Sequence, residues 1–349
     1  MATVTQIRGA LLEEAVLFLL SRVGYRIVYY PADSIDPSDI KNGRSGLELE
    51  GRGTWHQIDA IAEQYYTPAF MYPLRLLVEA KFYAHSPVGL NVVRNSVGVL
   101  KDISENCFSK HRFRGALSTV RFNYQSAVFG VSGFTKPAVE YAVAHQIFLI
   151  EYKNIPVIQP LVDAIRDFDE GCLTIQGINS ISEVRKILRE ALNMGYYSVD
   201  LHRFLKIKGI EIVDKRVRRA VHNIRGSYFG MLQGRWPMHL LTSQPLAEDA
   251  FTSDIVKCRL IGERNGHWCF TPVDVDQNDP GWFELQFFLP VELAKIVGQH
   301  WGDSQMVANT KEQYFSFITI TGKIGNTWRS VRLELDQNWL RRYIEQVVN

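Results

Sequence analysis

The sequence predicts an α/β domain, with a mixed β-sheet flanked by helices, followed by an α+β domain. Apolar and polar residues alternate at 57–61 and 78–82, which is the two-residue period of strands. Apolar residues recur every three or four positions at 6–22 and 88–103, which is typical of amphipathic helices. After Tyr152 this pattern changes, so we expect a domain boundary there.

In the first domain, residues 1–155, we expect a helix, three strands, a helix, a strand, a helix and a strand. Gly24 ends the first helix, and Thr135 is an N-cap with Pro137 in the first turn of the third. The expected elements are a helix at 6–22, a β-rich stretch at 25–30, strands at 47–50, 57–61 and 78–82, a helix at 88–103, a strand at 127–131, a helix from Thr135, and a strand at 147–150.

The second domain, residues 156–349, is expected to be helical to about residue 225 and strand-rich afterwards. We expect it to recognise, regulate or dimerise. Its expected helices are 161–168, 182–192, 291–301 and 338–347, and its most apolar strands are 283–289 and 314–320.

The composition is that of a soluble globular protein: 349 residues, 46% hydrophobic and 22% charged. No CxxC pair occurs among the cysteines, which favours reduced thiols and a cytoplasmic location over a zinc site or a disulfide framework. Glu13 and Glu14 interrupt the apolar part of the first helix, so no signal peptide is expected, and no stretch suits a membrane span. A net charge of +2 does not by itself identify a nucleic-acid binder.

Three side chains carry the chemistry: Asp59, Glu79 and Lys81. Strand alternation puts Glu79 and Lys81 on one face, and pairing the two strands would set Asp59 beside Glu79. Two neighbouring carboxylates favour a divalent cation such as Mg²⁺, which polarises a phosphodiester, while the lysine orients water or steadies charge on phosphorus. The alternative is a solvated edge strand, on which Glu-x-Lys is common by chance.

Further residues extend this pattern over residues 1–150, which resemble the PD-(D/E)xK nucleases and their Mrr-type restriction endonuclease branch. The resemblance implies a restriction-endonuclease-like fold, Asp59 and Glu79 as metal ligands, Lys81 as catalytic lysine, and Glu13 as a supporting acid. We also expect Gln57 to support these residues. Two departures are Ile58 in place of the proline and Glu79 where many Mrr-type proteins have glutamine. The matching segments are Gly9-Ala10-Leu11-Leu12-Glu13, Gly24-Tyr25, Asp59, Glu79-Ala80-Lys81, Val88-Gly89-Leu90, Val97-Gly98, Phe129 to Thr135, Ala138, Ala142 and Ile147 to Ile150.

A basic segment without acidic residues lies between Glu105 and Glu140, where cations are interleaved with aromatic residues. Such a segment beside a nuclease site suits phosphate contacts and base stacking, although a solvated loop is an equal alternative. The candidate nucleic-acid contacts are Arg94, Lys110, Arg112, Arg114 and Arg121.

The expected activity is therefore Mg²⁺- or Mn²⁺-dependent endonucleolytic hydrolysis of DNA, in restriction or defence against foreign DNA. A catalytically weak or inactive nucleic-acid-binding or sensor protein on a nuclease fold is one alternative, and an RNA-directed nuclease is another. Cutting both strands of a duplex takes two sites, so we expect a homodimer made by apolar segments such as Trp282 to Leu289. The alternative is that these segments form the core of the second domain.

Overall fold

The computed structural model divides into two compact units. The first unit comprises Met1–Ile150 with Leu161–Val221, and the second comprises Glu151–Pro160 with His222–Asn349. The structure describes residues 3–43, 46–64, 67, 69–114, 120–167, 185, 189, 211–244, 246–251, 253–262, 267–299, 303–325 and 327–348.

A five-stranded mixed sheet forms the centre of the first unit. Its strand order is β1 (Tyr25–Val28), β5 (Ala60–Gln64), β6 (Leu74–Lys81), β7 (Asn123–Gly130) and β8 (Phe148–Glu151). β5 is antiparallel to both β1 and β6, whereas β6 and β7 are parallel. The expected mixed α/β class is confirmed by this sheet and its helices.

A second, three-stranded sheet contains β2 (Ile40–Asn42), β3 (Leu47–Glu50) and β4 (Trp55–Ile58). The single strand expected at 57–61 is therefore wrong. β4 pairs with β3, β5 pairs with β1 and β6, and Asp59 lies where the chain passes from one sheet to the other. The alternation of apolar and polar residues cannot reveal this change of sheet, because alternation does not depend on which strands pair with the segment.

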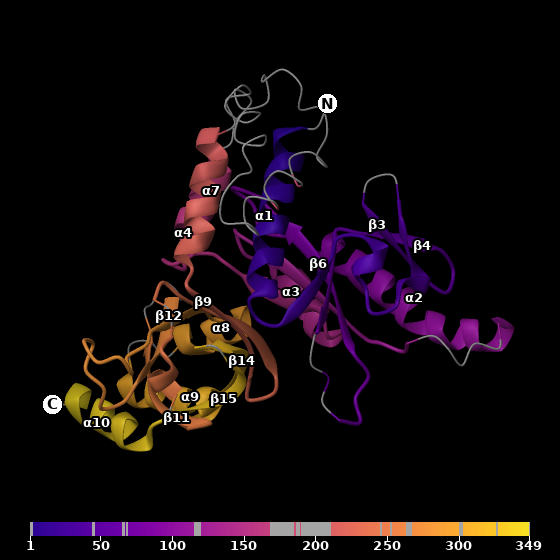
Figure 1. Ribbon diagram of the computed structural model, residues 1–349. Coiled ribbons are helices and arrows are strands. Elements are labelled where there is room, and N and C mark those ends of the chain that lie inside the picture. The colour runs from indigo at the N-terminus through magenta and orange to yellow at the C-terminus, as the bar shows by residue number, and fades with distance from the viewer. Residues whose placement is uncertain are drawn as a thin grey trace. The chain divides into compact units, whose positions relative to one another are not determined.

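Three helices cover the sheets of this unit (Figure 1). α1 (Val4–Ser21) packs on β1, β5 and β6, begins at a capping box on Thr3, and is followed by Gly24 at φ +96°. α2 (Leu90–Arg114) packs on β3 and β7 and runs beyond the expected end at 103. α3 (Lys136–Ala144) packs on α2, and its N-cap is Thr135, as expected.

One hydrophobic cluster joins the two sheets to α2. Leu77 of β6, which is 4% exposed, packs with Leu49 of β3, Ile58 of β4 and Ile103 of α2. Leu77 precedes Glu79 by two residues, so the two side chains lie on the same face of β6. This core therefore fixes the side of the sheet on which the polar residues of β6 lie.

The segment 161–221 belongs to the first unit, whereas the sequence analysis assigned it to the second domain. α4 (Gln159–Arg166) covers most of the expected helix 161–168, and α7 (Glu211–Asn223) follows. Arg216 of α7 forms an ion pair with Asp167 just after α4. Of the expected helix 182–192, only Arg185 and Arg189 lie within the described residues, and both are helical.

The second unit is built on a closed barrel, which the prediction of an α+β domain did not include. Among the described residues, neighbouring strands of the barrel are antiparallel except for β11 and β15, which are parallel. Around the barrel the order is β10 (Trp236–Thr242), β13 (Leu285–Phe288), β12 (His267–Pro272), β11 (Ile255–Gly262), β15 (Thr327–Leu335), β14 (Phe317–Ile324) and β9 (Gly226–Leu232).

Helices α8 (Val291–Gln299), α9 (Ser304–Phe315) and α10 (Gln337–Val348) accompany the barrel. α8 and α10 match expected helices, but α9 was not expected, and β14 begins at Phe317 rather than at residue 314. Asp303 caps α9 by accepting a hydrogen bond from the backbone N–H of Met306 at 3.0 Å.

The apolar segment considered for dimerisation lies inside the barrel. Phe283, Leu285, Phe287 and Leu289 are each at most 1% exposed and belong to the barrel core. The alternative that this segment forms the core is therefore correct, and it gives no reason to expect a dimer. None of the helices in the described part of the chain combines the length and apolar character that crossing a bilayer requires.

Candidate active site

The register of β5 and β6 brings two carboxylates together. Ala60 pairs with Val78 and Ile61 with Leu77, so the same register carried one residue further puts Asp59 opposite Glu79. Lys81 follows Glu79 by two residues and lies on the same face of β6. The three side chains come from the end of β6 and from the junction of β4 and β5.

Lys81 contacts both carboxylates. Its Nζ lies 3.2 Å from Oδ2 of Asp59 and also forms an ion pair with Oε1 of Glu79. The side chains of Asp59, Glu79 and Lys81 are 26%, 24% and 24% exposed, so solvent and a ligand can reach all three. The cluster carries two negative charges and one positive charge.

Burial and crowding shift the protonation of this cluster. Burial raises the pKa of Glu79, the charge of Asp59 raises it further, and Lys81 opposes both without cancelling them. Burial lowers the pKa of Lys81, but Asp59 and Glu79 outweigh burial and raise it well above its usual value. The ammonium group of Lys81 therefore stays protonated, but it does not fully offset the effects of burial and of the Asp59 charge on Glu79.

Glu13 of α1 adds a third acid near this cluster. It is 3% exposed, and burial raises its pKa well above the usual value, opposed by Arg185 and reinforced by Asp59. Arg185 Nη2 donates to Glu13 Oε2 at 2.7 Å, while Oε1 is buried with no partner in the described part of the chain. Glu13, which the sequence predicted as a supporting acid, therefore interacts electrostatically with Asp59 and Lys81.

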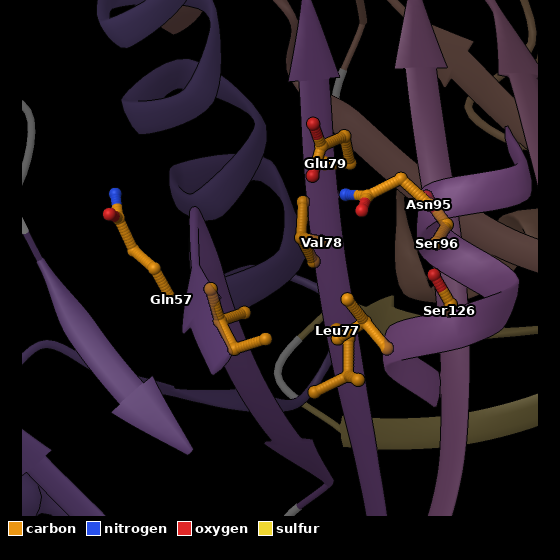
Figure 2. Close-up of a pocket in the computed structure, with 9 residues that line it drawn as sticks. Gln57, Leu77, Val78, Glu79, Asn95, Ser96 and Ser126 are labelled. Atoms are coloured by element: carbon orange, nitrogen blue, oxygen red, sulfur yellow. The ribbon is translucent and has the colours of Figure 1, made fainter. Parts of the chain in front are cut away.

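A small cavity beside Glu79 is shown in Figure 2. Gln57 is exposed on β4, and its amide points away from Glu79, whereas the amide of Asn95 on α2 is directed toward the Glu79 carboxylate. Asn95 was missed by the sequence analysis, because nothing local shows which face of α2 meets β6. The cavity is lined by Gln57, Ile58, Leu77, Val78, Glu79, Asn95, Ser96, Val99 and Ser126.

Two of the candidate nucleic-acid contacts have described side chains. Arg94 is exposed, with its guanidinium 5.7 Å from the centre of the Tyr141 ring. Arg121 lies 4.8 Å from the centre of the Tyr72 ring. Of these two arginines, Arg94 is the one near the cavity, because it directly precedes the lining residue Asn95 on α2.

The other three, Lys110, Arg112 and Arg114, lie on the last turns of α2, and their side chains are outside the described structure. Along a helix, the backbone of Lys110 stands about 22 Å from that of Asn95. The basic segment was expected beside the carboxylates. The part of this segment that lies on α2 is instead distant from them, because it lies near the far end of this long helix. The reason is that α2 continues to Arg114, past the expected end of the helix at residue 103.

The donor set suits a hard cation. No group of three or more His, Cys, Asp or Glu side chains disposed to hold a metal ion occurs among the described residues. Mg²⁺ commonly keeps several waters and takes only one or two carboxylates from the protein, so Asp59 and Glu79 suffice for it. The unpartnered Oε1 of Glu13 adds further oxygen-donor capacity nearby.

Comparisons with known proteins add little information about the function of this chain. No protein-family model matches the chain. No curated protein matches it either. One solved structure that is similar to it is a crystal structure of a protein of unknown function, with 15% sequence identity, 61% of this chain and 98% of that chain covered, and a TM-score of 0.30.

Proposed function

We propose that this chain is a Mg²⁺-dependent endonuclease that hydrolyses phosphodiester bonds in DNA. The observation that carries the proposal is the contact of Lys81 with both Asp59 and Glu79 on adjoining strands. Two carboxylates and a lysine at the accessible end of a strand are the side chains that metal-assisted phosphodiester hydrolysis needs.

The architecture of the first unit supports a restriction-endonuclease-like fold. A helix precedes a mixed sheet, and its strand β6 carries Glu79 and Lys81 and runs parallel to β7, reached through α2. This order is consistent with the resemblance of residues 1–150 to the PD-(D/E)xK nucleases. Restriction or defence against foreign DNA is the setting that the resemblance implies.

Asp59 and Glu79 would hold the metal ion. Their mutual proximity, the raised pKa of Glu79 and the unpartnered oxygen of Glu13 all indicate a site short of positive charge. When bound, Mg²⁺ polarises the phosphodiester and makes a coordinated water more acidic.

The protein groups act around that centre. Lys81 remains protonated, so its ammonium donates hydrogen bonds that orient the attacking water or steady charge on the phosphate oxygens. Glu13, whose pKa burial raises well above the usual value, interacts electrostatically with both Asp59 and Lys81. Arg94, exposed on α2, is available to contact a phosphate of the substrate.

A nucleic-acid-binding or sensor protein with little hydrolytic activity is the second candidate. Lys81 forms ion pairs with both carboxylates and so neutralises part of the charge that a metal ion would otherwise balance. The two candidates differ in whether a divalent cation enters and displaces these contacts.

The deciding experiment is a cleavage assay on the full chain. Wild-type protein should nick or cut DNA with Mg²⁺ or Mn²⁺ and be inactive with a chelator, and RNA of the same sequence tests the other polymer. Glu79→Ala and Lys81→Ala should each abolish cleavage and remain folded by circular dichroism. The proposal is wrong if the wild type cuts neither polymer, or if both variants cut as fast as the wild type.

A further inference from the structure

We infer that Arg185 is a positioning residue of the candidate active site. It lies outside the first 155 residues, so the site is completed by a part of the chain distant in sequence. This inference rests on the proposed function, because it names a residue that supports the same site. It also adds to the expected residue set, in which each site residue preceded residue 122.

Arg185 joins α1 to the junction of β4 and β5. Its Nη2 donates to Oε2 of Glu13 at 2.7 Å, and its Nη1 donates to the backbone carbonyl of Asp59 at 3.5 Å. The Glu13 side chain is 4% exposed and that of Arg185 is 21% exposed. One guanidinium therefore holds both the buried acid and the main chain from which the Asp59 carboxylate projects.

The pair keeps unused hydrogen-bonding capacity. Oε1 of Glu13 and Nε of Arg185 are both buried without a partner among the residues that the structure describes. Such orphaned atoms are costly in a purely structural ion pair, where both oxygens of the carboxylate are normally satisfied. The free acceptor and the free donor lie on the pair that is linked to Asp59.

A neighbouring arginine provides the contrast. Arg189, four residues further along the chain, donates to both oxygens of Glu14, from Nε at 3.1 Å and from Nη2 at 2.6 Å. Its guanidinium also stacks on Tyr29 at 3.7 Å from the ring centre, and Glu14 is 1% exposed. Both oxygens of Glu14 thus have partners, which is the arrangement of an ion pair that stabilises the fold.

The physical consequence concerns orientation. Without Arg185, Glu13 would be a buried carboxylate without its counter-ion, and the carbonyl of Asp59 would lose its donor. A carboxylate freed in this way reorients or takes up a proton, because an unpaired charge in that position is costly. Residues that orient a reactive group from behind typically change metal affinity or activity about 10- to 100-fold.

The test compares two arginines in the full-length protein. Arg185→Met should lower kcat for DNA cleavage and weaken Mn²⁺ binding, followed by electron paramagnetic resonance, by about 10- to 100-fold each. Arg189→Met removes an equally buried pair and should lower the melting temperature similarly while leaving kcat and Mn²⁺ affinity near those of the wild type. Arg185→Lys keeps the charge and should restore part of the loss.

A double-mutant cycle with Glu13→Gln tests the route. If Arg185 acts through Glu13, Arg185→Met should change kcat less in the Glu13→Gln protein than in the wild type. Equal losses in the Arg185→Met and Arg189→Met proteins, or fully additive effects, would overturn the inference while leaving the nuclease proposal intact. If the wild type does not cleave DNA, the nuclease proposal fails, and the Mn²⁺ affinities alone decide whether Arg185 is a positioning residue. The inference is also overturned if the protein does not bind Mn²⁺, or if all variants bind it equally well.

Discussion

The hairpin of β5 and β6 carries a charge cluster at each of its ends. At one end the strand register pairs Glu63 with Arg75, and at the other it places Asp59 opposite Glu79. Both clusters combine carboxylates with one cation on the same two strands. They differ in how many hydrogen bonds the cation donates and in how far the side chains are exposed to solvent.

The Arg75 cluster is closed. The Arg75 side chain is 0% exposed, and its guanidinium also lies 3.6 Å from the centre of the Phe122 ring. All three nitrogens of the guanidinium donate hydrogen bonds, and the acceptors are Glu63 Oε1, Asp39 Oδ2, the Tyr124 hydroxyl, Ser34 Oγ and the Asp36 carbonyl.

The Lys81 cluster is open. Its side chains are about a quarter exposed, and a single ammonium faces two carboxylates. Each cluster holds two carboxylates and one cation, so the difference lies in hydrogen bonding and exposure: in the closed cluster all three nitrogens of a planar guanidinium are engaged, and the cluster stabilises the fold. In the open cluster the two carboxylates are about a quarter exposed, so a cation from solvent can reach them.

The largest effect should come from removing the cation of the closed cluster. Arg75→Met leaves the buried Glu63 and the half-buried Asp39 without their partner, so the free energy of unfolding should fall by about 3–5 kcal/mol in urea denaturation. The matched control is Arg52→Met, which breaks the exposed pair with Glu105 and should cost about 0–1 kcal/mol. Equal losses would show that burial does not distinguish the two pairs.

A carboxylate exchanged in each cluster should separate stability from catalysis. Asp59→Asn should slow DNA cleavage by about 100-fold or more, because loss of a metal ligand removes several kcal/mol of transition-state stabilisation. Asp39→Asn should lower the melting temperature and leave the rate per folded molecule unchanged. The comparison fails if Asp39→Asn slows cleavage as much as Asp59→Asn does.

A smaller effect is expected at the edge of the closed cluster. The Tyr124 hydroxyl donates to Asp39 Oδ2 at 3.0 Å and accepts from Arg75 Nη1 at 3.2 Å. Tyr124→Phe should lower the free energy of unfolding by about 1–3 kcal/mol, because both buried partners lose a hydrogen bond. Tyr141→Phe on α3 serves as the control in the same denaturation experiment, and a larger loss there would contradict the prediction.

The smallest effect concerns Glu79 and pH. Because burial and Asp59 raise the Glu79 pKa in the folded protein, its ionisation costs stability, and this cost grows as pH rises above the ordinary value of 4.5. Glu79→Gln removes the cost, so the variant should melt higher than the wild type at neutral pH and match it below pH 4.5. Glu140→Gln, at an exposed position on α3, should show no such pH-dependent gain.

Local patterns were sufficient for the residues of the open cluster. Alternation in Val78 to Phe82 placed Glu79 and Lys81 on one face, because strand period is a property of the local backbone. The split between β4 and β5 at Asp59 could not be predicted, since it depends on which sheets the flanking strands join. Whether the three side chains catalyse hydrolysis remains a prediction.

Long-range contacts could not be predicted in the same way. Arg185 lies 172 residues from Glu13, and nothing in its own neighbourhood indicates the partner. Arg75 had a signal that was not used: a lone arginine within an apolar strand requires a buried acid, and strand pairing supplies Glu63. Barrel closure was missed for the same reason as Arg185, because β11 and β15 meet only in the folded chain.

The parallel pairing of β11 with β15 has a consequence for biosynthesis. The five-stranded sheet has all its strands once Glu151 has been made, whereas β9 and β11 wait for β14 and β15, which follow the other strands of the barrel in the sequence. Contacts between segments so distant along the chain form slowly and leave strand edges exposed meanwhile. During translation, the barrel is therefore the part of this protein most dependent on protection from aggregation.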